Sequence, residues 1–196
     1  MENKTAYDAD FYKANVVGSL GSAGLVLPIV LEVIPKINSA VDFGCGLGTW
    51  LAALKTLGVD EIRGYDGRWV DKGSLKISPE YFTAVELDKG VRVNKKYDLA
   101  ISLEVAEHLP KQSAELFVES LVNASDIVLF SAAAPYQGGT EHINEQWPDY
   151  WANIFSKHGY IAIDYIRKRI WNIEQISYYY RQNVLLFVKK TKKNKY

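Results

Sequence analysis

Cysteine is nearly absent from the sequence, since Cys45 is the one such residue among 196. A single cysteine excludes a disulfide within the chain, which fits the reducing conditions of the cytoplasm. The first ten residues, MENKTAYDAD, are polar and acidic and do not have the pattern of a secretory signal peptide. We therefore expect a cytoplasmic protein.

Long apolar runs and an excess of one charge are also missing. The longest apolar stretch, GLVLPIVLEVIP, contains Pro28 and Glu32 and is too short to span a bilayer. Lys+Arg and Asp+Glu each number 23, so no overall electric field attracts the chain to nucleic acid or to an anionic membrane. We expect neither as a partner, and the sequence specifies no oligomeric state.

The length of 196 residues and the hydrophobic content of 48% are, in contrast, ordinary for a globular domain. We expect a single domain over residues 1–196, with a helical lid at about 5–34, a core at about 39–190 and a basic tail at 189–196. The lid has two predicted helices, at 5–17 and at about 22–34. Its aromatic residues Tyr7, Phe11 and Tyr12 either cover a ligand or seal the edge of the sheet.

Strand and helix patterns alternate along the core. Short β-prone runs (AVDF, EIRGYDG, YFTAVEL, YDLAISL and DIVLFSA) are interspersed with helical patterns in TWLAALKTLG, at 111–123 and in PDYWANIFSKHGY. This alternation predicts parallel βαβ units with helices on both faces of a sheet. The last two runs, YIAIDYIRKRI and NVLLFVKK, have no clear helix between them and predict an antiparallel hairpin at one edge.

Three glycines follow the first predicted strand, in VDFGCGLGTW. Gly44, Gly46 and Gly48 allow the backbone to turn sharply and to lie close to a ligand. Both dinucleotides and S-adenosylmethionine bind such loops. However, the repulsion between the Asp42 carboxylate and a pyrophosphate would cost about 1 kcal/mol or more of binding free energy. Thr49 also stands where the dinucleotide fingerprint G-x-G-x-x-G has its third glycine. The loop therefore favours a cationic, nucleoside-type ligand.

Further acids end the next two predicted strands. Asp66 can accept hydrogen bonds from two ribose hydroxyls, although YDG is also a common turn sequence. Trp69 either packs on the adenine or belongs to the core. Glu86 can accept a hydrogen bond from the adenine amino group, with Asp88 as an alternative. Ligands of open α/β sheets bind at this carboxyl edge.

These motifs resemble those of class I S-adenosylmethionine-dependent methyltransferases. The resemblance is carried by VDFGCGLGTW, GYDGRWV, VELDKG and YDLAISLEVAEHLP, and EVAEHL, LFSAAAP and GGTEHINEQWPDYWANIF resemble a bacterial subgroup of small methyltransferase-domain proteins. It implies an α/β fold: a Rossmann-like, doubly wound, seven-stranded, mostly parallel sheet with an antiparallel last strand. No NPPY-type tetrapeptide follows the fourth predicted strand, which disfavours methylation of exocyclic amino groups of bases.

The resemblance also implies how the cofactor, S-adenosyl-L-methionine, is bound. The methionine end would be held by Asp42, Gly44 and Gly46, and by the carbonyl groups of Ser102 and Leu103. Asp66 would bind the ribose, and Glu86 with the Leu87 backbone would bind the adenine. Many relatives have Asp where Glu86 stands.

Histidine suits the removal of a proton from a hydroxyl acceptor near neutral pH. His142, in GGTEHINEQ, and His108, in EVAEHLP, are the candidate catalytic bases, and His158 is interpreted as a helix cap. A metal held by His108, Glu141 and His142 matches no standard zinc spacing, so we predict none. The expected substrate-binding residues are Glu104, Glu141, Gln146, Trp147 and Tyr150. Glu107 and Glu145 are expected at the same edge, where the acids either bind a hydroxylated or amino substrate or are solvated.

The sequence thus predicts an S-adenosylmethionine-dependent methyltransferase that acts on a small polar acceptor, an oxygen of a sugar or related metabolite in glycan biosynthesis. The alternatives are a protein or RNA methyltransferase, a nucleoside-binding module without catalysis, and an NAD-dependent dehydrogenase.

Overall fold

A computed structural model describes the backbone of residues 9–190 and the side chains of residues 18–190. Its strands are β1 (Ser39–Phe43), β2 (Glu61–Asp66), β3 (Phe82–Ala84), β4 (Leu99–Leu103), β5 (Ile127–Ser131), β6 (Tyr160–Ile163) and β7 (Leu185–Lys189). Its α-helices are α1 (Ala9–Val33), α2 (Thr49–Thr56), α3 (Ala114–Ala124), α4 (Pro148–Lys157), α5 (Ile166–Ile170) and α6 (Tyr178–Asn183). Short 3₁₀ turns lie at Lys72–Ser74, Pro79–Tyr81, Leu87–Lys89, Ala106–His108 and Lys111–Ser113.

The seven strands form one sheet in the order β3-β2-β1-β4-β5-β7-β6. Strands β1 to β5 pair in parallel, whereas β7 is antiparallel to both of its neighbours, β5 and β6. The predicted fold class is therefore confirmed. The direction of the strand order reverses between β1 and β4, and the carboxyl ends of these two strands frame the switch point where open α/β sheets bind ligands.

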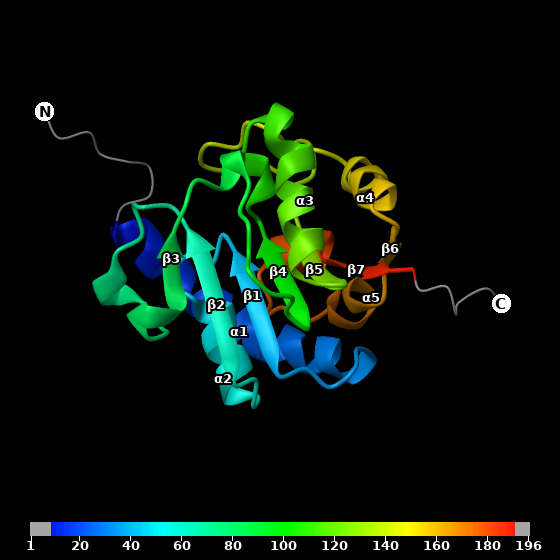
Figure 1. The fold of residues 1–196 in the computed structure, drawn as a ribbon. Helices are drawn as coiled ribbons and strands as arrows, with labels where there is room; N and C mark the ends of the chain where they lie inside the picture. Colours follow the sequence, from blue (N-terminus) through cyan, green and yellow to red (C-terminus); the bar gives the residue numbers. More distant parts are fainter. Residues whose placement is uncertain (1–8, 191–196) are drawn as a thin grey trace, which may run out of the picture.

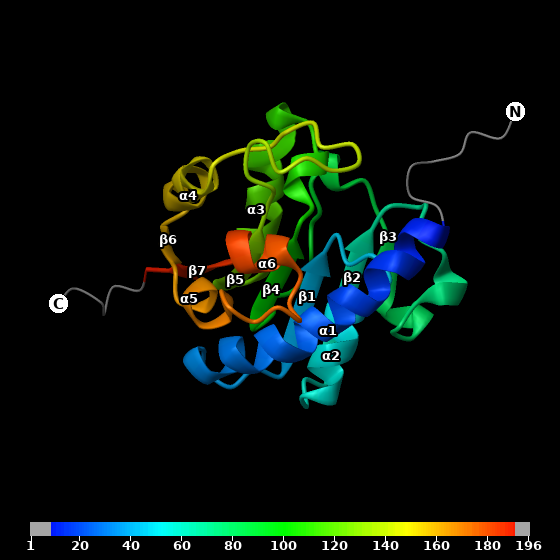
Figure 2. The same ribbon diagram turned by 180° about the vertical axis from the view of Figure 1, so that it is seen from behind.

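Helices cover both faces of this sheet (Figures 1 and 2). Helices α3 and α4 lie on one face, and α1, α2 and α5 lie on the other. Strand β1 is buried on both sides: Ala40 belongs to the apolar cluster under α1 and α2, and Val41 and Phe43 belong to the cluster under α3. Burial on both faces fixes the register of the central strands and so the position of the residues at their carboxyl ends.

The amino-terminal segment differs from its prediction, because one helix, α1, replaces the two expected at 5–17 and 22–34. Glycine has a low helix propensity, but the side chains of Val26, Leu27 and Val30 are fully buried in the apolar cluster that α1 shares with α2. The burial of these side chains outweighs the low helix propensity of the glycines within α1. The side chains of Tyr7, Phe11 and Tyr12, predicted to form a lid, lie outside the described part of the chain, as do residues 191–196 of the basic tail.

At the carboxyl-terminal end, the predicted antiparallel pairing of the last two strands is correct, but the prediction that no helix connects them is wrong. Strands β6 and β7 do pair antiparallel at one edge of the sheet. However, YIAIDYIRKRI is not one strand, since β6 ends at Ile163 and α5 and α6 follow before β7. Among residues 9–190, none of the helices combines the length and the apolar character needed to cross a bilayer.

Candidate active site

The glycine loop between β1 and α2 is fastened to the end of β2. The backbone N–H groups of Gly44 and Cys45 both donate to the carbonyl of Tyr65, at 2.7 and 3.2 Å. The Gly46 N–H donates to Oδ2 of Asp66 at 2.6 Å. Gly44 has φ 86°, and a Cβ there would collide with the Val105 side chain. Only glycine allows this close turn, which exposes the loop to a ligand.

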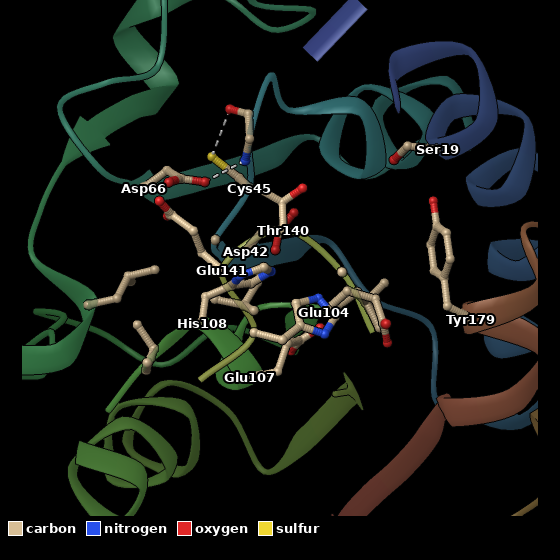
Figure 3. Close-up of a pocket in the computed structure, with 18 of the residues that line it drawn as sticks. Ser19, Asp42, Cys45, Asp66, Glu104, Glu107, His108, Thr140, Glu141 and Tyr179 are labelled. Atoms are coloured by element: carbon tan, nitrogen blue, oxygen red, sulfur yellow. Dashed lines mark hydrogen bonds between the residues drawn. The ribbon is translucent and has the colours of Figure 1, made fainter. Parts of the chain in front are cut away.

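A cavity of about 880 Å³ opens over this loop and extends along the carboxyl ends of β2, β1 and β4. Twelve of the residues predicted to form the site line it: Asp42, Gly44, Gly46, Asp66, Trp69, Glu86, Leu87, Leu103, Glu104, His108, Glu141 and His142. Figure 3 shows Asp66 and Cys45 on one side of this cavity and His108 and Glu107 on the other. The volume lies in the upper part of the range of small-molecule sites.

Two buried carboxyl groups mark the β1–β2 end of the cavity. Asp42 is 2% exposed, and burial raises its pKa well above the usual value, with the nearby Asp66 raising it further. Burial also raises the pKa of Asp66, although hydrogen bonds from the N–H groups of Gly46 and Gly67 oppose this. A cation bound here would favour the ionised forms. The same burial raises the pKa of the Cys45 thiol, which makes it a poor nucleophile.

The predicted adenine contacts lie at the outer edge of the cavity. Trp69 is 53% exposed, so it is not a core residue, and its ring packs against Gly67, where a Cβ would collide with it. The Glu86 carboxylate is exposed and forms an ion pair with Lys89, and Leu87 is buried. A ligand ring could therefore lie on Trp69 and meet the backbone of Leu87.

One predicted cofactor residue is in a different place. Ser102 is fully buried within β4 and does not line the cavity, whereas Leu103 does. The difference follows from position along the strand, because Ser102 lies within β4 and is paired with Phe130 of β5. Leu103 is the last residue of β4, where the chain reaches the carboxyl edge.

The segment after β4 supplies the acids at the other end of the cavity. Glu104 has φ 55°, and its carboxylate accepts hydrogen bonds from Gln137 Nε2 at 2.9 Å and Asn183 Nδ2 at 3.1 Å. Burial raises the pKa of Glu104, and these hydrogen bonds oppose the rise. Glu107 is fully buried, and burial together with Glu104 raises its pKa well above the usual value.

The two candidate histidines lie side by side. The ring centroids of His108 and His142 are 4.8 Å apart, at nearly perpendicular planes. Burial and the neighbouring His142 lower the pKa of His108 to about 4, while a hydrogen bond to the Glu141 backbone opposes this. The Nδ1 atom of His142 is 2.9 Å from Oε1 of Glu145. Residues far apart in the sequence thus form one imidazole pair on the cavity wall.

The predicted substrate wall is only partly present. Gln146, Trp147 and Tyr150 do not line the cavity. Gln146 Nε2 donates to Asn144 at 3.0 Å, Trp147 is 58% exposed beside the start of α4, and Tyr150 packs on Trp151. The backbone hydrogen bonds of this segment turn these side chains away from the sheet edge.

Several cavity residues were not predicted. Among them, Gln137, Thr140 and Tyr179 line the cavity. Gln137 and Tyr179 lie outside the quoted motifs, whereas Thr140 stands beside the predicted Glu141 in GGTEHINEQ. Glu107, which the sequence offered as a possible substrate contact, also lines the cavity. His158, in contrast, is exposed at the end of α4 and lies outside the cavity.

Comparison with known proteins identifies the family. Residues 25–159, more than half of the chain, match the family model described as a methyltransferase domain. The chain belongs to this family. It is a class I S-adenosylmethionine-dependent methyltransferase, in agreement with the prediction from its motifs. The acid pair at the glycine loop fits the cationic methionine end of that cofactor.

Individual relatives are more distant. A curated relative, the ribosomal protein L11 methyltransferase of Fusobacterium nucleatum, is 29% identical over 142 residues. The match covers 67% of this chain and 44% of the relative, so the chain corresponds to less than half of that protein.

Solved structures share the fold. The magnesium protoporphyrin IX methyltransferase of Synechocystis PCC 6803, crystallised with bound S-adenosylhomocysteine, superposes with a TM-score of 0.63 at 17% identity. That alignment covers 96% of this chain and 90% of the other. Human N-acetylserotonin methyltransferase gives a TM-score of 0.61 at 17% identity, over 92% of this chain and 55% of that one.

Proposed function

We propose that this methyltransferase transfers a methyl group to a hydroxyl oxygen of a small polar molecule, a sugar or a related metabolite. The observation that carries the proposal is the polarity of the two cavity ends. Buried acids lie at the β1–β2 end, and an imidazole pair lies beside Glu104 at the β4 end. The cofactor and the acceptor would occupy these ends respectively.

When bound, S-adenosylmethionine supplies an activated methyl group on its sulfonium sulfur. The protein's main task is then to hold the acceptor oxygen close to the methyl carbon and in line with the carbon–sulfur bond. A hydroxyl acceptor would lose its proton on methylation, so side chains of this protein have to accept that proton or pass it to water. His108 and His142 line the cavity at its β4 end, where one of the two rings would accept that proton.

The residues of the acceptor end support a small acceptor. The loop residues Gln137 and Thr140 and the helix residue Tyr179 all line the cavity. Glu104 and Gln137 line the cavity, and both are hydrogen-bonded to the buried Asn183 and to each other, which fixes their polar groups for a hydroxylated molecule. Such convergent polar groups in a preformed cavity are typical of small-molecule sites.

The test uses methyl-labelled cofactor and a cell extract separated into small-molecule, protein and RNA fractions. We expect the label in the small-molecule fraction, and His142→Ala should keep S-adenosylhomocysteine binding while losing most turnover. Label in the protein or RNA fraction would overturn the choice of acceptor. Thermal stabilisation by NAD instead of S-adenosylhomocysteine would overturn the cofactor.

A protein acceptor is the second candidate. The curated relative of this chain is named for methylation of ribosomal protein L11. However, the chain matches only 44% of that relative, so the remainder of the relative has no counterpart in the match. The labelled protein fraction in the same experiment distinguishes this candidate from the first.

A further inference from the structure

We propose that Glu107, His108 and His142 bind a divalent transition-metal cation on the wall of the cavity. Each of the three residues offers one ligand atom, and these atoms all lie within 4.8 Å of one another. The three residues also line the cavity, so a cation there would be accessible to an acceptor. One carboxylate and two imidazoles are a common set of ligands for such cations.

Glu107 provides an independent indication of a missing partner. Its side chain is fully buried, and within the described part of the chain neither carboxylate oxygen has a hydrogen-bond partner of ordinary geometry, although the backbone of Glu107 itself and of Ala133 lies close enough to interact with it. Burying an unpaired carboxyl group is costly, and buried charges are normally paired or coordinate metals. A divalent cation between this carboxylate and the histidine rings would remove that cost.

Each histidine ring has a hydrogen-bond partner of the kind that metal-binding histidines have. Nδ1 of His142 is hydrogen-bonded to Glu145, which leaves Nε2 to face a cation. Glu145 is itself fixed, because its carboxylate accepts hydrogen bonds from the N–H groups of Tyr136 and Gly138, both at 2.8 Å. Metal-binding histidines usually make such a hydrogen bond to a carboxylate or carbonyl through the second ring nitrogen.

The corresponding partner of His108 is the Glu141 backbone, to which its ring is hydrogen-bonded. The two loops that carry the ligands are also joined directly. The N–H groups of Ile143 and Asn144 both donate to the Glu107 carbonyl at 2.9 Å. The three ligands are therefore held together by the fold before any ion binds.

The ligand set favours zinc, cobalt, manganese or iron in the divalent state over magnesium or calcium, which prefer oxygen ligands. Three protein ligands leave coordination positions open, as in catalytic sites. If the proposed function holds, an acceptor hydroxyl could occupy an open position and release its proton to water more readily. The two histidines would then act as ligands and not as bases.

The spacing in the sequence did not indicate this site. The set considered from the sequence contained Glu141, whose carboxylate is exposed. Glu107 takes its place because the 3₁₀ turn Ala106–His108 brings its side chain into the interior beside the two rings.

Direct metal binding by the full chain tests the proposal. Protein stripped with a chelator is titrated with Zn²⁺ by calorimetry and with Co²⁺ by visible absorption. We expect one tight site per chain, lost in Glu107→Gln and in His142→Ala. Glu145→Gln should weaken binding by about 10- to 100-fold, because this residue acts through His142. His158→Ala, which removes an exposed histidine outside the cavity, is the matched control.

A folding defect is excluded by the melting temperature of the metal-free proteins. Glu107→Gln keeps the size of a buried side chain and removes a carboxyl group that has no side-chain hydrogen-bond partner among the described residues, so it should melt no lower than the wild type. Equal metal affinity in the wild type and Glu107→Gln would overturn the site. A lower melting temperature of Glu107→Gln, with no metal bound by either protein, would overturn it as well. Stabilisation by S-adenosylhomocysteine is measured in parallel: if it persists while no metal binds, the metal proposal fails and the methyltransferase function stands.

Discussion

Replacement of Asp42 by asparagine separates the electrostatic role of this residue from its packing role. Asp42→Asn keeps the shape of a side chain that is 2% exposed and removes its charge. Two unit charges about 4 Å apart interact by about 4 kcal/mol at an effective dielectric constant of about 20. Desolvation of the carboxylate offsets part of this energy. A net loss of about 2–4 kcal/mol corresponds to a cofactor dissociation constant that is about 30- to 700-fold higher.

The same change should stabilise the free protein. Burial raises the pKa of Asp42 in the folded protein above its value in the unfolded chain. The folded state therefore binds this proton more tightly, and the associated stability is present at low pH and lost as the pH rises through the raised pKa. At neutral pH, asparagine avoids that loss. We expect a higher melting temperature, by about 2–4 °C for each kcal/mol gained.

Cofactor affinity should also depend on pH in a predictable direction. A bound ammonium group lowers the pKa of Asp42, so binding releases a proton in the window between the lowered and the raised pKa. Affinity then rises with pH through this window in the wild type and does so less in Asp42→Asn.

Calorimetry with S-adenosylhomocysteine over a pH series measures both quantities, and thermal denaturation gives the stability. Asp60→Asn, at an exposed position before β2, is the control for loss of one carboxylate. An unchanged dissociation constant in Asp42→Asn, or a lower melting temperature, would refute the idea that this carboxylate is held in the cavity for a cationic ligand.

Three further substitutions test the site and the fold. Asp66→Ala should lower both stability and cofactor affinity, because it leaves the N–H groups of Gly46 and Gly67 without acceptors. Each lost acceptor should reduce the free energy of unfolding by about 1–3 kcal/mol, which denaturation measures, and calorimetry measures the affinity. Trp69→Ala should leave stability within about 0.5 kcal/mol but weaken S-adenosylhomocysteine binding by about 2- to 12-fold, the value of one aromatic stacking contact; equal affinity would remove Trp69 from the adenine site. Tyr160→Phe should lower the free energy of unfolding by about 1–3 kcal/mol in urea and leave cofactor binding intact, since its buried hydroxyl donates to backbone carbonyls at the end of α3.

The cofactor end of the site could be predicted because its residues follow directly on strands. Asp42 and Asp66 lie at the carboxyl ends of β1 and β2, and the three glycines lie between β1 and α2. When a run of residues forms a parallel strand, its end must reach the same edge of the sheet as its neighbours do. Order along the chain was therefore sufficient to predict that these acids and glycines meet at one edge of the sheet.

The acceptor end depends on how loops fold back, which no local pattern records. Gln146 stands close to His142 in the sequence, but its N–H donates to the Ala133 carbonyl and its side chain turns toward Asn144. The meeting of Glu107 with His142 follows from the pairing of β4 with β5, because the loops after adjacent parallel strands lie side by side. That pairing could have been used to predict the contact, although not the burial of the carboxylate.

The two short helices near the carboxyl terminus were missed for a different reason. Helices α5 and α6 span five and six residues. Segments of this length contain too few turns to display a helical period, and their isoleucines and tyrosines are equally frequent in strands. Packing of Ile166, Ile170 and Tyr180 against the cluster under α1 determines their conformation.

The position of β7 between β5 and β6 has a consequence for biosynthesis. A ribosome delivers β6 before β7, so the nascent chain carries an edge segment whose partner in the sheet of the described residues, β7, has yet to emerge. Until Leu185–Lys189 leaves the exit tunnel, β5 also exposes one side to any other polypeptide nearby. Insertion of this strand therefore closes the sheet in a single late event, and chaperones would be needed most during the interval before it.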